Sequence, residues 1–333
     1  MASFREFHKT LLIAGLLAVS LFHSQLAGAT GSKEASPSPR YSIPSGILEK
    51  PFRFAGEFIP LTRDDVRCRV QFQLNFLLLD ARSVLTAWMV EKSRYDWIFE
   101  EIFKKENVPL DFILLSPVLG GLGAGASNRS SGVGWWALEK PCDSSEGLTM
   151  SDDAWHDDRL DLEASTRCFV VRLKSIKKEL GTDSWLTAAA AYVTSTKTVA
   201  ETGKRWNTLK YWDLPLPENA ESLMARWIAL GIIRSNPAAF GIKFSESPPL
   251  TYDQINGLIL AKDLSIGEIA RMTGVHPRLI LELNPKVKPS PGKFPAKVGG
   301  KSVAHSLAVP KGTGWTLVNN LKKDAYLVEK PSP

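Results

Sequence analysis

The sequence predicts a mainly α-helical protein, in which one large helical domain is followed by a small module of mixed α and β structure. Between residues 51 and 246, apolar residues recur at helical spacing, and few stretches alternate as strands do. A Ser/Pro-rich boundary at residues 245–249 then precedes a compact unit with helix and strand signals. The 333 residues suffice for one large and one small domain.

Four segments of the large domain have clear helical periodicity. Residues 64–79 place Val66 and Val70 on one face, and residues 95–103 do the same with bulkier side chains. The other two segments are residues 162–180 and residues 185–193. The last of these is rich in alanine, which allows close packing inside a helical core.

The small module contains two expected helices. Ser265 and Glu268 have the spacing of a capping box, and Gly274 is a typical residue for ending the helix that follows. Pro277 is expected to open the second helix, which should stop before Pro285.

A strand is expected at residues 306–309, after a long loop at residues 286–301. These elements define a module at residues 250–312, and residues 313–333 are expected to form a tail that frays beyond residue 322.

The N-terminus has the pattern of a secretory signal peptide. Residues 1–29 combine a basic start, an apolar run at residues 10–22 and a small-residue A-x-A site ending at Ala29. The run is shorter than the roughly 20 residues that span a bilayer, although an uncleaved membrane anchor is the alternative. We therefore expect export to the periplasm or cell envelope, with a linker at residues 30–50 and no membrane-spanning segment after cleavage.

The three cysteines permit one disulfide and one free thiol. Cys142 and Cys168 are the first pair to test, whereas Cys68 lies in a helical pattern and is expected to be a small buried hydrophobic residue. Neither the cysteines nor the histidines have the spacing of a metal site, so we expect no metal and no cofactor.

The formal net charge is +6. No dense basic patch with interleaved aromatic residues is present in the sequence, which argues against nucleic acid as a partner. A modest positive excess suits an anionic envelope polymer, but it equally suits an ordinary solvated surface.

Several ordered motifs resemble the lytic murein transglycosylase D family, whose members cleave peptidoglycan. Residues 155–167 are similar to its W-x-D-x-R-x-D-x-x-x-S-T-R stretch, and residues 185–199 are similar to its alanine-rich helix. Tyr95 and residues 108–109 match the approach to the catalytic helix, and residues 211–217 match a later signature. The resemblance implies a lysozyme-like helical domain at residues 51–246 with a sugar-binding cleft.

The chemistry of that family depends on one glutamate, as the resemblance implies. This residue protonates the glycosidic oxygen and then takes a proton from a sugar hydroxyl, which leaves a 1,6-anhydro end. An ungapped alignment from Pro109 puts Leu119 at the glutamate position, Gly120 after it, and Ala137 where a cleft glutamine belongs. A leucine side chain cannot donate a proton. The resemblance therefore implies a retained fold with a degenerate active site.

A displaced carboxylate is the alternative source of the proton. Residues 116–136 contain no Asp or Glu, so a small slip of the alignment does not restore the acid. Glu139 is the nearest carboxylate and the fallback acid, followed by Glu146, Asp152 and Asp153. We expect all four to be solvated surface groups.

Three aromatic residues are candidates for glycan binding. Trp135 and Trp136 either stack on a sugar face or pack in the core, and Tyr192 either donates a hydrogen bond to a glycan or is a core tyrosine. Gly134 and Trp136 keep the residues of the family, but residues 193–195 replace its Asn-Ala-Gly.

The charged residues of the 155–167 motif are expected to form a structural network. Asp157, Arg159, Asp161 and Arg167 carry the charges, and ligand contact is the alternative. His156 lies among carboxylates, where an ion pair is expected.

The small module resembles a LysM-like module, on residues 264–270, 274–275, 283–285 and 309–310. Such modules bind N-acetylglucosamine polymers. The long loop at residues 286–301 departs from the usual pattern.

Our hypothesis from the sequence is a non-catalytic protein that binds peptidoglycan glycan strands or serves as a scaffold in the cell envelope. One alternative is an active lytic transglycosylase that cleaves the MurNAc–GlcNAc bond with a displaced carboxylate. Another is an adaptor that binds envelope proteins and no longer binds glycan.

Overall fold

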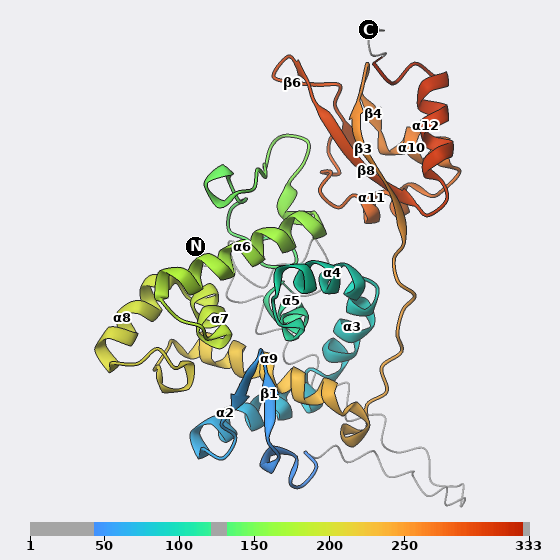
Figure 1. The fold of residues 1–333 in the computed structure, drawn as a ribbon. Coiled ribbons are helices and arrows are strands. Elements are labelled where there is room, and N and C mark those ends of the chain that lie inside the picture. Colours follow the sequence, from blue (N-terminus) through green and yellow to red (C-terminus); the bar gives the residue numbers. More distant parts are fainter. Residues whose placement is uncertain (1–42, 121–131, 329–333) are drawn as a thin grey trace, which may run out of the picture. The chain divides into compact units, whose positions relative to one another are not determined.

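The computed structural model describes residues 43–120 and 132–328. The expected signal peptide at residues 1–29 lies outside this part. The described chain begins in the helical domain, which is built mainly from helices around one apolar core (Figure 1). Its α-helices are α2 (Asp64–Asn75), α3 (Arg82–Ser93), α4 (Asp96–Glu106), α5 (Leu115–Gly120), α6 (Leu162–Leu180), α7 (Trp185–Val193), α8 (Thr196–Trp206) and α9 (Glu218–Ser235).

Short helical segments connect these elements. They are the 3-10 helices η1 (Ile47–Glu49), η3 (Leu110–Leu114), η4 (Ser144–Glu146), η5 (Asp158–Leu160), η6 (Tyr211–Asp213) and η7 (Pro237–Phe240), and the π-helix η2 (Phe76–Asp80). The predicted helix at residues 64–79 is therefore α2 continued by η2.

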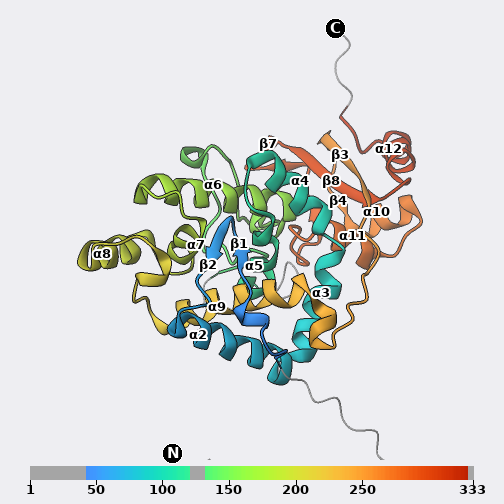
Figure 2. The same cartoon turned by 60° about the horizontal axis from the view of Figure 1, so that its bottom comes forward.

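Helix α9 runs through the centre of this core. Trp227, Ile228 and Leu230 are fully buried, and α9 lies beside α2 (Figures 1 and 2). A hairpin of β1 (Phe52–Phe54) and β2 (Glu57–Ile59) packs on the same helix. Phe54 fills the space beside Gly231, where a Cβ atom would come within 2.2 Å of the Phe54 ring. A glycine is therefore needed for this close approach.

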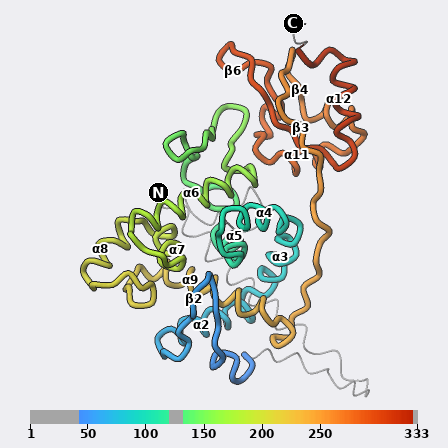
Figure 3. The backbone as a smooth tube through the Cα atoms, viewed as in Figure 1, coloured from blue at the N-terminus to red at the C-terminus, as the bar shows by residue number. Residues whose placement is uncertain are grey.

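The C-terminal module has a core of its own. Strand β3 (Tyr252–Ile259) pairs antiparallel with β8 (Ala304–Pro310), and Figure 3 traces the chain from η7 into β3. The elements between and after these strands are β4 (Leu264–Ser265), α10 (Ile266–Thr273), α11 (Pro277–Leu283), β5 (Lys293–Phe294), β6 (Lys297–Val298), β7 (Lys301–Ser302) and α12 (Gly314–Lys323). Strands β4 and β5 form one antiparallel pair, and β6 and β7 form another.

The predicted helix signals of the module are confirmed. Ser265 and Glu268 form the capping box of α10, and Gly274 takes the left-handed conformation at its end. Pro277 opens α11. The buried Asn284 at the end of α11 donates to the carbonyl of Ala308 at 2.7 Å and accepts from its N–H at 2.9 Å, which fixes the helix end to β8.

Residues 314–326 belong to the core of the module, so the prediction of a tail at residues 313–333 is wrong for this segment. Leu317 and Leu321 of α12 are fully buried, and Tyr326 is 5% exposed. The apolar face of α12 explains the difference, because it covers α10 and removes apolar surface from water.

The described residues contain no helix with both the length and the apolar character that crossing a bilayer requires. In the same residues, no cluster of three or more His, Cys, Asp or Glu side chains is placed to hold a metal ion.

Candidate functional site

The end of α5 carries Leu119, the residue that the ungapped alignment assigns to the family acid. Leu119 is 1% exposed and belongs to the first apolar core, together with Leu115 and Val118. Because α5 spans only six residues, this core fixes the orientation of its side chains. The position therefore presents a buried hydrocarbon side chain, which has no proton to exchange.

A tight turn follows at residues 132–138, closed by a bridge between Val133 and Leu138. Gly134 has a φ of 74°, and a Cβ atom there would lie 2.2 Å from the carbonyl oxygen of Arg159. Ala137, at the glutamine position of the family, also takes a left-handed conformation with a φ of 48°. Such a backbone costs an alanine roughly 1 kcal/mol, so the surrounding turn must hold it.

Trp136 lies inside the helical domain, with 0% exposure. Its ring stacks on Phe169 with a centroid distance of 3.9 Å, and its indole N–H donates to Thr166 Oγ1 at 2.9 Å. The ring therefore has its polar atom satisfied and no face open to solvent.

Tyr192 joins α7 to this turn. Its hydroxyl donates to the Trp136 carbonyl oxygen at 2.8 Å, and its ring meets Phe169 edge-on at 4.9 Å. The side chain is only partly buried. The three predicted aromatic residues thus lie near one another, but they have different surroundings.

Trp135 faces a different environment from that of its neighbour. It is 6% exposed, and its ring meets Tyr95 at a centroid distance of 4.8 Å. Ser116 donates to the Trp135 carbonyl oxygen at 3.0 Å, which ties the turn to α5. Trp135 also forms part of the wall of a cavity of about 780 Å³. Sequence reasoning does not separate Trp135 from Trp136, because both are adjacent aromatic residues.

The four carboxylates considered as substitutes lie in different electrostatic settings. Glu139 is exposed, and its backbone carbonyl accepts a hydrogen bond from Arg159. The hydrogen bond from Arg172 holds the pKa of Glu146 below its usual value, and that from Lys288 does the same for Asp152.

Burial would raise the pKa of Asp153, but hydrogen bonds from the backbone of Trp155 and His156 lower it overall. Glu146, Asp152 and Asp153 are therefore shifted away from the raised pKa that a general acid needs near neutral pH.

Two half-buried carboxyl groups that are not among the residues predicted from the sequence have raised pKa values. Burial raises the pKa of Asp96, which pairs with Lys92, and the pKa of Asp111, which accepts the N–H of Ala55 at 2.8 Å. Asp111 lies in η3 beside the β1–β2 hairpin and Asp96 at the start of α4, so each has a structural partner.

The expected network of the 155–167 motif is formed in part. Arg159 contacts Asp157 and Asp152 through Nη2 at 2.7 Å each. Asp161 caps α6 by accepting the N–H of Ala164 at 3.0 Å. Arg167 stays apart from this network, because its nearest carboxylate is Glu163, 3.9 Å away.

His156 has the ion-pair surroundings that the sequence predicts. Its Nδ1 lies 2.9 Å from Asp153 Oδ1, and its Nε2 lies 3.5 Å from Asp158 Oδ2. Burial lowers the pKa of this imidazole, but the hydrogen bonds and charges of Asp158 and Asp153 raise it overall.

The predicted disulfide between Cys142 and Cys168 is present. It attaches the segment after the turn to α6, and Arg172 reinforces this attachment through an ion pair with Glu146 at 2.8 Å. The prediction for Cys68 is wrong, because its side chain is exposed. Cys68 lies on the outer side of α2, whose buried residues include Val66 and Val70.

A domain of this kind, mainly helical and with these motif segments, is consistent with the lysozyme-like class. The curated proteins similar to the chain include the membrane-bound lytic murein transglycosylases D of Escherichia coli strain K12 and of Escherichia coli O6:H1 strain CFT073. Each is 25% identical to it over 201 residues, which is 58% of this chain and 42% of the relative.

The chain thus spans less than half the length of these curated relatives. No family model matches it. The distant similarity supports the resemblance that the motifs indicate.

Proposed function

We propose that this protein is a peptidoglycan-associated homologue of the lytic transglycosylases that does not cleave glycan. In this proposal it is exported to the periplasm or cell envelope, where it binds glycan strands or serves as a scaffold. The names of its relatives, together with the ordered motifs, support association with murein.

The observation that carries the loss of activity is the burial of Leu119. The side chain is 1% exposed at the position where the family needs an ionisable group. Glycosidic cleavage requires proton donation to the leaving oxygen, and a hydrocarbon in the core cannot supply it. Glu139 is exposed to solvent, whereas a general acid of this kind needs a buried site.

The C-terminal module supports glycan binding as the retained function. The residues that resemble a LysM-like module lie in a unit with its own apolar core, anchored by Leu264, Ile269 and Val309. We propose that this unit contributes affinity for N-acetylglucosamine polymers, and that Trp135 and Tyr192 are further candidates for ligand contact.

Incubation of the purified protein with intact sacculi tests this proposal. We expect the protein to sediment with sacculi and to release no soluble 1,6-anhydro muropeptides, as measured by mass spectrometry against an active muramidase as positive control. Release of anhydro products would refute the loss of activity, and its disappearance in Glu139→Gln would identify the acid. Absence from the sacculus pellet would favour an adaptor for envelope proteins instead.

Restoring the family residues should not restore activity. The double variant Leu119→Glu with Ala137→Gln is expected to remain inactive, because Gly120 and Val193 also differ from the family.

Leu119→Glu alone is expected to lower the free energy of unfolding by roughly 3 kcal/mol or more, since it buries a carboxyl group in an apolar core. Urea unfolding measures this loss, with Leu119→Met as a control that should cost under about 1.5 kcal/mol.

A further inference from the structure

A cavity of about 780 Å³ lies away from the position of the family acid. Its wall includes Tyr95 at the N-cap of α4, Trp135, Arg167 of α6, and Tyr252 and Gln254 of β3. Among the described residues that line it, neither Leu119 nor Tyr192 appears. The volume falls within the range of roughly 300–1,000 Å³ that is usual for small-ligand sites.

Most charges of the cavity wall are already neutralised by one another. Arg94 pairs with Glu282, and Lys286 pairs with Asp161 at 3.0 Å. These pairs leave few charged groups available to a ligand.

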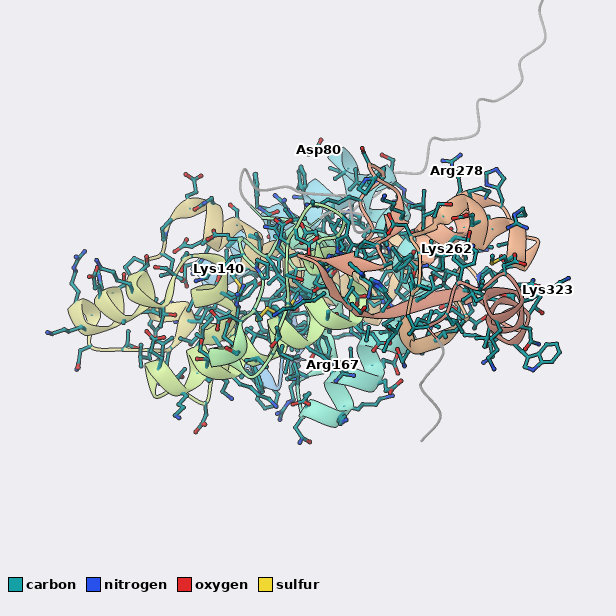
Figure 4. All side chains as sticks on the ribbon, turned by 90° about the horizontal axis from the view of Figure 1, so that it is seen from above. Asp80, Lys140, Arg167, Lys262, Arg278 and Lys323 are labelled. Atoms are coloured by element: carbon teal, nitrogen blue, oxygen red, sulfur yellow. A yellow bond between two sulfur atoms is a disulfide. The ribbon has the colours of Figure 1, made fainter. Side chains whose placement is uncertain are left out.

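Arg167 is the exception among these charged groups. Its guanidinium makes no hydrogen bond to any residue that the structure describes, and its nearest carboxylate, Glu163, is 3.9 Å away. Glu163 instead accepts a hydrogen bond from the Tyr252 hydroxyl at 3.0 Å. Figure 4 labels Arg167 on α6, which packs against α4. A planar group with five N–H donors therefore borders the cavity with only this long ion pair to Glu163.

Trp135 supplies a second donor that lacks an acceptor. Its indole N–H is buried, and no acceptor for it is found in residues 43–120 and 132–328. A buried polar group normally has a hydrogen-bond partner, so an unpaired one in a cavity wall needs an explanation. A ligand that brings hydrogen-bond acceptors would pair with Arg167 directly and would reach the buried Trp135 N–H only after a shift of the ring.

We propose that this cavity binds a short peptide with a free carboxylate, which pairs with Arg167. A carboxylate matches the guanidinium fork in charge and shape. A neutral sugar would leave Arg167 with only its long contact to Glu163, whereas a doubly charged phosphate would meet stronger repulsion than a single carboxylate does from Glu91, Asp161, Glu163 and Glu282 in the same wall. The aromatic rings of the wall suit apolar side chains, and the side-chain amides of Gln254 and Asn256, which hydrogen-bond to each other and to Ser306, add a polar edge.

Calorimetry on the full chain tests this with three probes: acetyl-trialanine with a free C-terminus, the same peptide as its C-terminal amide, and chitotriose. We expect the free acid to bind at least about tenfold more tightly than the amide, as a charge-assisted bond implies. Arg167→Gln should weaken binding of the free-acid peptide by a similar factor and leave the affinity for the amide peptide unchanged. Arg205→Gln, an exposed arginine on α8, is the matched control and should change neither.

A second variant separates binding from folding. Glu163→Gln removes the negative charge nearest Arg167 and should strengthen acid binding a few-fold, an effect that loss of structure cannot produce. Equal affinity for acid and amide, saturable binding of chitotriose in place of the peptide, or no peptide binding at millimolar concentration would each overturn the proposal. Because the peptides carry no glycan, these results are independent of the sacculus experiment.

Discussion

Gly134 has two physical constraints in the turn that precedes the disulfide. Its backbone is left-handed, and the carbonyl oxygen of Arg159 occupies the space where a Cβ would lie. The turn therefore approaches the 155–167 motif as closely as only a glycine allows. This contact explains why a glycine is needed at residue 134 even though the site beside it lacks the family acid.

Gly134→Ala should lower the free energy of unfolding by more than about 2 kcal/mol, because strain and steric overlap add. Gly147→Ala is the matched control: Gly147 has a similar φ of 75°, but nothing lies within 4 Å of its Cβ position. That change should cost only about 1 kcal/mol. Urea denaturation compares the two, and equal losses would mean that the overlap with Arg159 is relieved at no cost.

His156 makes stability depend on pH. Its folded pKa is raised above the ordinary value of 6.5, so the folded state binds the proton more tightly than the unfolded state. The stabilisation is fully present below pH 6.5 and is lost as the pH rises through the folded pKa. The difference in unfolding free energy between wild type and His156→Gln should therefore shrink from pH 6 to pH 8. NMR titration of the imidazole checks the cause, and a pKa at or below 6.5 would contradict it.

At the scale of elements, α6 organises this side of the domain. Its buried face carries Phe169, which stacks on Trp136, and Cys168, which forms the disulfide. Asp161 caps its first turn, and Gly181 ends it in the left-handed conformation. One helix thus positions both the turn at residues 132–138 and the segment that follows this turn.

Replacing Cys142 and Cys168 with alanine should lower the free energy of unfolding by about 3 kcal/mol, because the bridge closes a loop of 26 residues in the unfolded chain. Cys68→Ser should change it by less than about 0.5 kcal/mol, since that thiol is exposed. Denaturation with and without reductant measures both. A reductant effect that persists in the double variant would point to another cause.

At the scale of the molecule, the 155–167 motif contacts the second apolar core. Trp155 packs near Phe294 and His305 of the module, with centroid distances of 5.7 and 5.2 Å. Its carbonyl oxygen accepts the N–H of Lys288 at 2.8 Å. The motif that resembles a family signature thus serves as a contact with the C-terminal module in this chain.

Deleting residues 314–333 should unfold the module while the first core stays folded, because Leu317 and Leu321 belong to the second core alone. Hydrogen exchange should then rise across β3 and β8 but not across α9. Deletion of residues 329–333 alone is the control and should leave β3 and β8 protected. Unchanged exchange in the longer deletion would show that α12 is dispensable.

Local signals predicted much of the fold, because they act over a few residues. Helical periodicity gave the bounds of α6 and α7, and the capping box at Ser265 marked the start of α10. Cys68 was misjudged because periodicity alone does not reveal which face of α2 meets the core. The segment at residues 314–326 was misjudged because its burial depends on α10, which is distant in sequence.

By itself, the sequence determined that residues 116–136 hold no carboxylate, and its resemblance to the family predicts Leu119 at the position of the acid. Only the tertiary structure decided that Trp136 is enclosed while Trp135 borders a cavity with Arg167. Composition and spacing state which groups a chain carries. Which of those groups meet a partner, and which remain unsatisfied, depends on contacts between segments far apart along the chain.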